Sequence, residues 1–596
     1  MVASPDKTGD MRAQDEMVEQ APTIQAHLEE HHHHHHHHKE LEVVPIDQEA
    51  VDHAVHIDLS WRSWVVVFIC SFAVMAQVLV VTGAASVIAF IKRDLGNEAL
   101  AGWVIQGPLL MQSVLSPIMG RLSDMLDRKW LASVPPVIAF AGAIISAKAT
   151  SMTMLIVGGI LIGTTLSSIA IVHAIPSEIL PLKYRPLANS TGFIGGAVGG
   201  LIGSLGSGAV TSLAPDGWRY IFWIQAGVHG LNALGLLIFY WPPKNTEIPK
   251  MSWEEYVWAC DPIGSVLFIC STTLMLLALD WAGGAYHWND PHVAVPVSIG
   301  LLLMVLFCLY EWKGRSDGLV AHVFFHRNAN FALSTFAFTV EGWIFYSAVN
   351  SITPQLILHL GFETNAWKIS IRQLSYTLTT MVMALPLTWY STKYKDLRSP
   401  LVLTFIIFLA VCICYATIQP SWNAAQIAIA VVCAIGQSGP LTLLVACIQF
   451  CSPHAFISTA TGLAFSARAI GGAFGSAVLD AIINGRLASH HDQAVSAAAV
   501  GAGLPSAQVP SILAAIKAGK ESLPNIPSAV WQAAVEASRW EYARAYRLGW
   551  ASIIPFVVLG TVAVASMRGV KELMTEKIEA TLERVPEVRE DKIAAV

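Results

Sequence analysis

Long apolar runs alternate with short polar segments from about residue 60 to about residue 570. Each run has about 20 mainly apolar residues, and a helix of that length covers about 30 Å, the thickness of the hydrocarbon core of a bilayer. The runs lie at approximately 63–84, 98–119, 130–148, 152–174, 190–212, 219–241, 262–281, 294–312, 331–357, 367–390, 400–418, 424–449, 456–482 and 549–567. The pattern predicts an all-α polytopic membrane protein with fourteen transmembrane helices.

The composition also indicates a membrane protein. Hydrophobic residues make up 54% of the chain, charged residues make up 13%, and the mean hydropathy is +0.53 with the polar ends included. The net charge of -6 is spread along the chain and does not support a nucleic-acid partner, which needs a concentrated basic face. We therefore expect the lipid bilayer as the partner of most of this surface.

The cysteines do not suggest a disulfide framework. Most of the 9 cysteines fall within apolar runs, where we expect them to be small buried hydrophobic residues. Cys412 and Cys414 form a C-x-C pair, but a metal role is disfavoured inside an apolar helix. No metal site and no cofactor are predicted.

The first 60 residues are polar and acidic and lack the apolar core of a signal peptide, so the first span must direct insertion. They include an uninterrupted histidine run from His31 to His38. A metal-binding segment and an affinity tag are alternatives. We favour a disordered tail with incidental metal affinity.

The order of the runs predicts the domain organisation and the orientation. An even number of spans places both termini on one side, and the greater number of Lys and Arg residues in the short loops on that side favours the cytoplasm. We expect a cytoplasmic tail at 1–60, a six-helix half at 61–241, two additional helices with linkers at 242–330, a second six-helix half at 331–567 with a long outer loop at 484–548, and a cytoplasmic tail at 568–596. The plasma membrane is the expected location, with the vacuolar membrane as the alternative.

A densely charged loop joins the second and third predicted spans. Its sequence is Gly120-Arg-Leu-Ser-Asp124-Met-Leu-Asp127-Arg128-Lys129. It resembles the major facilitator superfamily pattern Gly-x-Leu-x-x-Asp-x-x-Gly-Arg-Lys, with Asp127 in the place of a glycine. The resemblance implies a cytoplasmic gating loop formed by Gly120, Asp124, Arg128 and Lys129, in which the aspartate caps a neighbouring helix end. An ordinary charged loop of another membrane protein is the alternative.

Two further motifs resemble the drug:proton antiporters of the same superfamily. Trp218-Arg-Tyr-Ile-Phe222 is similar to the signature that opens their sixth span, and Arg468-Ala-Ile-Gly-Gly472 is similar to their penultimate span. The fourteen predicted spans match a subgroup in which two helices are inserted between two six-helix halves. Within it the chain resembles fungal trichothecene efflux pumps and siderophore transporters.

The fifth predicted span is rich in glycine. Repeated Gly-x-x-x-Gly spacing allows two helix backbones to approach closely, and static packing is one interpretation. The stretch that contains Gly195, Gly199 and Gly200 also resembles the antiporter motif Gly-Pro-x-x-Gly-Gly, which implies export, although Gly196 replaces the proline. In many proton-coupled exporters the fourth span carries an arginine where this chain has Gly159, so coupling through that position is excluded.

Ionisable and polar residues within the predicted spans are candidates for coupling or for a substrate cavity, because such groups are costly in hydrocarbon. Glu341 and Arg468 lie at similar depth in the ninth and thirteenth spans, so we expect them to meet. A fixed structural ion pair is the alternative to a role in proton or substrate handling. The other candidates are His229, Gln77, Tyr346 and Asn350, for which helix-to-helix hydrogen bonds are the alternative.

No phosphate-binding loop, metalloprotease motif or nucleophile elbow is present, so neither an enzyme nor an ATP-driven pump is expected. By resemblance, the function is proton-coupled efflux of a toxin or secondary metabolite by a monomeric secondary transporter, with a small-molecule substrate and protons as partners. Uptake of a siderophore and its iron by proton symport is the alternative. A nutrient sensor that does not transport is a third possibility.

Overall fold

The computed structural model describes residues 59–86, 91, 94–97, 102–211, 213–214, 216–242, 252–282, 288–326, 328–363, 366–517 and 520–575. The expected terminal tails, including the histidine run, lie almost entirely outside these residues. Helices account for all the regular secondary structure in the described part of the chain. The predicted all-α architecture is confirmed.

The helices follow the predicted apolar runs closely. The first group consists of α4 (Trp61–Ser86), α6 (Gly102–Met125), α7 (Arg128–Ala147), α8 (Met152–Ser167), α9 (Ile169–Ile179), α10 (Arg185–Leu201), α11 (Ser207–Thr211) and α12 (Arg219–Phe239). Next come α13 (Trp253–Ala259), α14 (Pro262–Ala282) and α15 (Pro291–Leu309). The last group consists of α16 (Asn330–Trp343), α17 (Thr353–His359), α18 (Ala366–Tyr394), α19 (Arg398–Tyr415), α20 (Asn423–Phe450), α21 (Ile457–Gly501), α22 (Val509–Lys517) and α23 (Ser528–Ala565).

Short π-helical and 3-10 segments connect or interrupt these helices. The π-helices are η3 (Ile202–Gly206), η4 (Tyr310–Gly314) and η6 (Ile344–Ile352). The 3-10 turns are η2 (Leu182–Tyr184), η5 (His322–Phe325), η7 (His454–Phe456), η8 (Ser506–Gln508) and η9 (Lys571–Leu573). The η6 segment divides the predicted ninth span into α16 and α17, a local irregularity that often accompanies a functional site.

Among the described residues, 8 helices are long and apolar enough to cross a membrane, or up to 9 if the pair Trp253–Ala259 and Pro262–Met275, bent by 43°, forms one span. Several other predicted spans are broken into shorter helices, for example at η6. The count of fourteen spans therefore stays a prediction.

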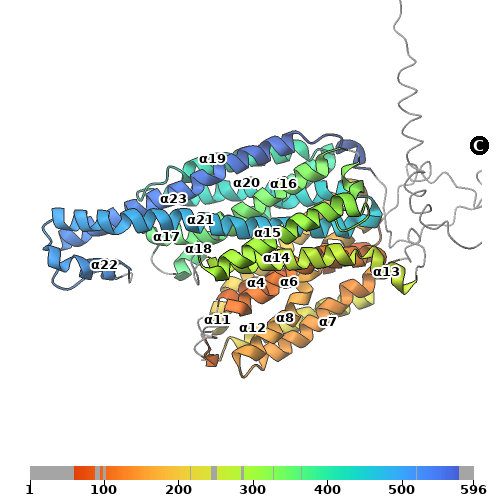
Figure 1. The fold of residues 1–596 in the computed structure, drawn as a ribbon, viewed down its shortest axis with the longest axis horizontal. Helices are drawn as coiled ribbons and strands as arrows, with labels where there is room; N and C mark the ends of the chain where they lie inside the picture. Colours follow the sequence, from red (N-terminus) through yellow and green to blue (C-terminus); the bar gives the residue numbers. More distant parts are fainter. Residues whose placement is uncertain are drawn as a thin grey trace, which may run out of the picture. The chain divides into compact units, whose positions relative to one another are not determined.

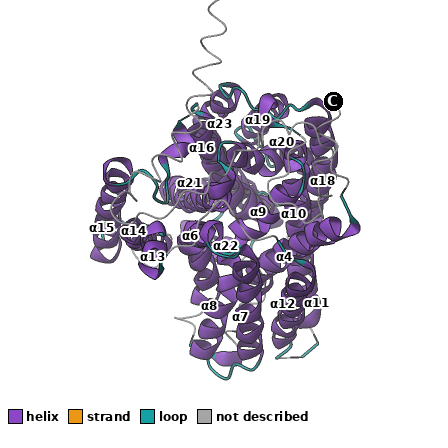
Figure 2. Cartoon of the chain, turned by 90° about the vertical axis from the view of Figure 1, so that its right-hand side faces the viewer, coloured by secondary structure: helices purple, strands orange, loops and turns teal. Residues whose placement is uncertain are grey.

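Helices α4 to α12 pack mainly with one another, and so do helices α16 to α23 (Figure 2). The second group shares one large buried core, whereas the first has three smaller ones. The groups meet where α21 packs against α6 and α9 and where α10 packs against α18 and α20. These two sets of helix contacts form the interface between the groups.

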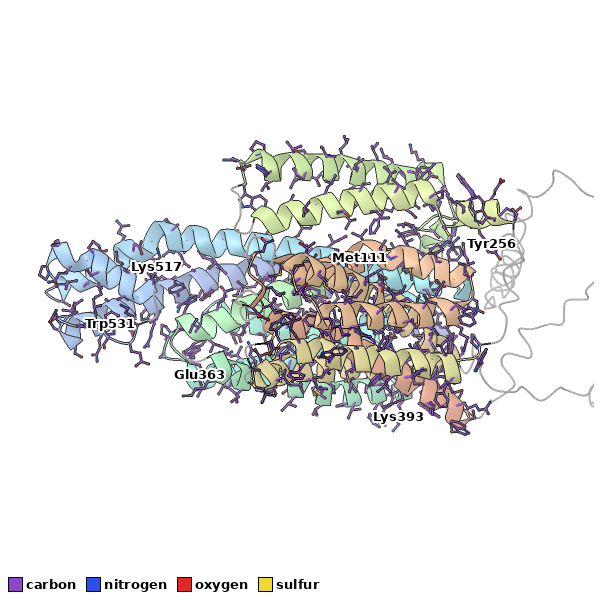
Figure 3. The ribbon with its side chains drawn as sticks, turned by 90° about the horizontal axis from the view of Figure 1, so that it is seen from below. Met111, Tyr256, Glu363, Lys393, Lys517 and Trp531 are labelled. Atoms are coloured by element: carbon purple, nitrogen blue, oxygen red, sulfur yellow. The ribbon has the colours of Figure 1, made fainter. Side chains whose placement is uncertain are left out.

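Helices α14 and α15 form a pair that stands beside the other helices (Figure 3). They pack chiefly against each other, and α14 also contacts α6 and α21. Most of the apolar surface of α15 is exposed, as expected for a helix that faces lipid.

The segment 484–548, which connects the last two predicted spans, is largely helical. Helix α21 continues to Gly501 and α23 begins at Ser528, so the two helices run side by side beyond their neighbours, with α22 at the tip (Figure 1). Val495, Leu504, Ile512 and Val530 are buried in a small core at this tip. The alanine-rich sequence favours helix, and this apolar face stabilises the hairpin.

Candidate functional site

Asp124, at the end of α6, caps the N-terminus of α21 in the other helix group. Its Oδ1 accepts a hydrogen bond from the backbone N–H of Ser458 at 3.0 Å, and its Oδ2 accepts one from the backbone N–H of Thr459 at 2.8 Å. The Thr459 hydroxyl also donates to Oδ2, at 2.8 Å. A carboxylate satisfies free N–H groups at a helix start and interacts favourably with the helix dipole. The contact therefore joins the two groups electrostatically.

Arg128 extends this contact into a buried charge network. Its guanidinium lies 3.0 Å from Asp124 Oδ1 and 3.0 Å from Oε1 of Glu178, at the end of α9. The other oxygen of Glu178 lies 2.5 Å from Nε2 of His454, the first residue of the η7 turn that leads into α21. Arg128 also donates to the Ser458 hydroxyl. Three side chains from the first group thus hold one helix start of the second group.

Gly120 allows the two helices to approach closely enough for this network. A Cβ atom at Gly120 would overlap the carbonyl oxygen of Ser458. Asp127, where the superfamily pattern has glycine, adopts extended backbone angles (φ −65°, ψ 111°) and caps α7 by accepting from the N–H of Lys129. The turn needs no positive φ at this position, so aspartate replaces glycine without strain.

Lys129 acts within the first group rather than between the groups. Its Nζ donates to the carbonyl oxygens of Leu237 and Tyr240, both at 2.8 Å, and lies 3.4 Å from the centre of the Trp241 ring. A cation at the C-terminus of α12 satisfies free carbonyl groups and complements the helix dipole.

Gln449 of α20 is a second point of contact between the groups, which we did not identify in the sequence. Its Oε1 accepts hydrogen bonds from Ser177 at 2.7 Å and Asn189 at 3.1 Å. Its carbonyl oxygen accepts one from Arg185 at 3.1 Å. A glutamine near a helix end carries no distinguishing signal, because its partners come from distant helices.

Glu341 and Arg468 form a buried ion pair between α16 and α21. Arg468 Nε lies 2.6 Å from Glu341 Oε2, and Arg468 Nη2 lies 3.1 Å from Glu341 Oε1. Both residues are more than 90% buried. The expected meeting of these residues is found, with two parallel charge-assisted hydrogen bonds. Gly342 makes it possible, because a Cβ there would overlap the carbonyl oxygen of Arg468.

Polar and aromatic side chains surround this ion pair. Gln437 of α20 donates to Glu341 Oε1 at 2.9 Å and accepts from the Tyr376 hydroxyl of α18 at 2.5 Å. Arg468 donates to the Tyr346 hydroxyl at 3.3 Å and lies 4.9 Å from the centre of the Phe345 ring. The hydrogen bonds form a chain from Tyr346 to Tyr376.

A cavity of about 10 Å³ adjoins Glu341, and its lining includes Phe408 and Pro440. This volume holds about one water molecule. Glu341 is therefore enclosed on this side. A change in its charge alters its interactions with neighbouring protein groups rather than with bulk solvent.

A family model with the description Major Facilitator Superfamily matches residues 67–476. The chain belongs to the Major Facilitator Superfamily. Its fold agrees, since the structure of the human organic anion transporter MFSD10 (TETRAN) aligns with a TM-score of 0.51 at 11% identity, over 84% of this chain and 99% of that one. The protein is therefore an integral membrane transporter of small molecules and not an enzyme.

Fungal transporters are among the most similar curated proteins. The MFS-type transporter prx5 of Penicillium rubens is 25% identical over 539 residues, covering 88% of this chain and 95% of that protein. The trichothecene efflux pump TRI12 of Fusarium sporotrichioides is 25% identical over 515 residues, covering 82% of this chain and 83% of that protein. The resemblance to these fungal facilitators is confirmed over most of the chain.

The glycine motif of this facilitator faces α4. A Cβ at Gly195 would overlap the carbonyl oxygen of Ser71, and one at Gly199 would overlap that of Met75. Gly200 is different, since the nearest atom to a Cβ there, in Val78, lies at 3.8 Å. Gly195 and Gly199 are therefore required for close helix packing, whereas Gly200 is not.

The remaining candidates lie apart from the Glu341–Arg468 pair or cannot be placed. Gln77 of α4 donates to the Thr165 carbonyl oxygen at 2.8 Å. His229 of α12 is fully buried, and its ring nitrogens have no hydrogen-bond partner among the described residues. The side chain of Asn350 lies outside the described part of the structure. Of the five candidates whose side chains the structure describes, Glu341, Arg468 and Tyr346 are brought together.

Proposed function

We propose that this facilitator exports a fungal toxin or other secondary metabolite in exchange for protons, with the end of the molecule that carries Asp124 in the cytoplasm. Efflux is supported by the relatives, which include the trichothecene efflux pump and a dehydrocurvularin exporter of Aspergillus terreus, 28% identical over 220 residues, covering 35% of this chain and 37% of that protein. The contacts of Asp124, Arg128 and Glu178 with the start of α21 hold the cytoplasmic end together. The structure then corresponds to the state that is closed toward the cytoplasm.

The Glu341–Arg468 ion pair carries the proposal of proton coupling. A buried carboxylate is stable beside a guanidinium, but protonation removes its charge and weakens both charge-assisted hydrogen bonds. Arg468 would then be an unpaired cation among aromatic rings. Proton arrival at Glu341 therefore changes the energy of the α16–α21 contact, which gives a physical link between a proton and helix movement.

Gln437 connects this pair to the interface between the helix groups. It bonds both Glu341 and Tyr376, and Tyr376 lies on α18, which packs against α10 of the first group. A change at Glu341 can reach α18 through this hydrogen-bond chain.

The test measures flux of a labelled trichothecene into inside-out vesicles with an acidic lumen. The wild-type protein should accumulate the label, whereas Glu341→Gln should lose this accumulation but retain exchange of label without a proton gradient. Glu363→Gln, which changes a half-buried carboxylate outside this hydrogen-bond network, is the matched control. Proton-driven accumulation by Glu341→Gln at the wild-type rate would contradict coupling through this residue.

A second measurement tests direction. Cells that overproduce the protein should tolerate the trichothecene better, and cells that lack it should retain more label. Increased iron accumulation from a ferric siderophore without a change in tolerance would instead support uptake. No transport of either compound would favour a sensor.

A further inference from the structure

The inserted helix pair, defined here as residues 252–325, has no role in the mechanism described above. It lies beside α6 and α21. Arg121, in the charged loop, is the residue at which the contacts converge. We did not place Arg121 in the gating loop from the sequence, because the superfamily pattern allows any residue at this position.

Arg121 is 6% exposed and contacts both ends of the inserted pair. Its Nε donates to the carbonyl oxygen of Ala259, at the end of α13, at 3.1 Å. Its Nη2 donates to the carbonyl oxygen of Asp317, in the segment after η4, at 3.4 Å. The planar guanidinium has donors in a fixed fork, so these bonds fix the position of both segments relative to α6.

The third contact of Arg121 is with the second helix group. Its guanidinium carbon lies 4.4 Å from the centre of the Phe456 ring. Phe456 immediately precedes α21, whose N-terminus Asp124 caps. Phe324 of the inserted pair packs against the same ring, with the ring centres 6.0 Å apart. Phe456 is thus held between Arg121 and the inserted pair.

The part of the inserted pair that meets Arg121 is a compact polar block. Asp261 is fully buried and accepts hydrogen bonds from the N–H groups of Gly264 at 3.1 Å and Leu319 at 3.2 Å. Glu311 accepts from the N–H of Val320 at 3.3 Å. A Cβ at Gly264 would overlap carboxylate oxygens of both acidic residues, so the two carboxylates converge at this point.

Arg315 completes the polar block by interacting with two of its acidic residues. Its Nε lies 2.9 Å from Oδ1 of Asp317, and its Nη1 lies 3.7 Å from Oδ1 of Asp261. Although burial alone would raise the pKa of the Asp317 carboxyl, the hydrogen bond and charge of Arg315 hold that pKa below its usual value. The carbonyl groups that Arg121 binds therefore come from segments that the block keeps in fixed positions.

We propose that Arg121 is a positioning residue that couples the seating of the inserted helix pair to closure of the cytoplasmic end. When the polar block is packed against Arg121, the guanidinium is held against Phe456. It then stabilises the start of α21 at the position where Asp124 caps it. When α21 moves away, Arg121 loses its aromatic contact and the inserted pair loses one of its anchors. The inserted helix pair therefore stabilises the closed state. The direction of the transport cycle rests on the proposed function, but the coupling itself does not.

Hydrogen–deuterium exchange of the full-length protein in nanodiscs tests this coupling without any substrate. Arg121→Ala should increase amide exchange about tenfold in peptides that cover 315–325 and in peptides that cover 452–462, the effect expected for loss of a hydrogen bond to a charged group. Exposed Arg398→Ala, at the start of α19, is the matched control and should change neither region. Unchanged exchange in 452–462 would overturn the proposal.

A second variant distinguishes coupling from two independent local effects. Asp261→Asn weakens the polar block but touches no residue of α21, and it should also increase exchange in 452–462. In the Arg121→Ala background, Asp261→Asn should have a smaller effect on 452–462, because the Phe324–Phe456 contact remains but the connection through Arg121 is lost. Equal effects of Asp261→Asn in both backgrounds would refute the coupling even if transport proceeds as proposed. If amide exchange changes as expected but the protein transports neither compound, only the proposed function is contradicted.

Discussion

Asp124 and Ser458 are 334 positions apart in the sequence, yet the carboxylate of Asp124 accepts the backbone N–H of Ser458 at 3.0 Å. A charged side chain of one helix group thereby completes the first turn of a helix in the other group. The bond exists only while the two groups are together at this end. Its strength therefore contributes directly to the equilibrium between the closed and open states.

Asp124→Asn should leave the protein inserted and abundant but slow its transport. An amide still accepts a hydrogen bond, but it loses the attraction to the helix dipole and to Arg128, a loss of about 1–3 kcal/mol in favour of the open state. Turnover at equal surface abundance is the measurement. Asp127→Asn is the control, since asparagine caps a helix as well as aspartate does. Equal turnover of Asp124→Asn and the wild type would show that the charge does not bias the cycle.

Gly199→Ala should reduce thermal stability, whereas Gly200→Ala should not. The added methyl group at Gly199 meets the Met75 carbonyl oxygen, and such overpacking costs about 1–3 kcal/mol. At Gly200 the nearest atom, in Val78, is at an ordinary van der Waals distance of 3.8 Å. Unfolding midpoints of the purified protein in detergent would compare the two variants. Equal midpoints would show that α4 and α10 can separate without cost.

Glu341 and Arg468 should show strong energetic coupling in a double-mutant cycle. Glu341→Gln or Arg468→Gln alone leaves a buried charge without a partner and should cost about 3–5 kcal/mol, whereas the double variant leaves no unpaired charge. Abundance should therefore recover in the double variant, and proton-driven flux should not. Recovery of both would indicate a purely structural ion pair. Additive losses in abundance and flux would show that the contact contributes to neither.

His359, two residues beyond the predicted ninth span, should make the contact between α17 and α23 sensitive to acid. It stacks on Tyr542, with ring centres 4.1 Å apart, and Nδ1 lies 2.6 Å from the Tyr546 hydroxyl. Burial, and then the charge of His491, lower the pKa of His359 below its usual value of about 6.5. The neutral ring is therefore favoured in the folded state.

The sign of the effect follows from this lowered pKa. The contribution of His359 to stability is complete above pH 6.5, and it is lost as the pH falls from there through the lowered native pKa. His359→Phe keeps the stacking but cannot titrate, so its unfolding midpoint should change less than that of the wild type between pH 7.5 and pH 5.5. His491 and Asp492, which lie 3.0 Å apart, are present in both proteins, so the comparison isolates the change at His359. An identical pH dependence would exclude His359 as the source.

The local sequence determined the helices, because every segment that crosses a bilayer must satisfy its backbone hydrogen bonds internally. Apolar runs of about 20 residues are therefore sufficient to place most helices of this chain, although not the extension of α21 and α23 beyond residue 484, where alanine-rich sequence forms helix without a long apolar run. The meeting of Glu341 and Arg468 was also predictable, since equal depth in two spans and the cost of an unpaired charge both favour it.

Only the tertiary structure decided which distant residues become partners. Gln437, Gln449 and Arg121 have no local signal, because each gains its importance from carbonyl groups or side chains on other helices. His229 illustrates the same limit. It is a polar residue within a predicted span, but it makes no hydrogen bond to the Glu341–Arg468 pair. Depth in the membrane is fixed by position along a helix, but rotation and neighbours are fixed by packing between helices. The sequence alone therefore predicts the depth of a side chain in the membrane. The packed structure determines which residues that side chain contacts.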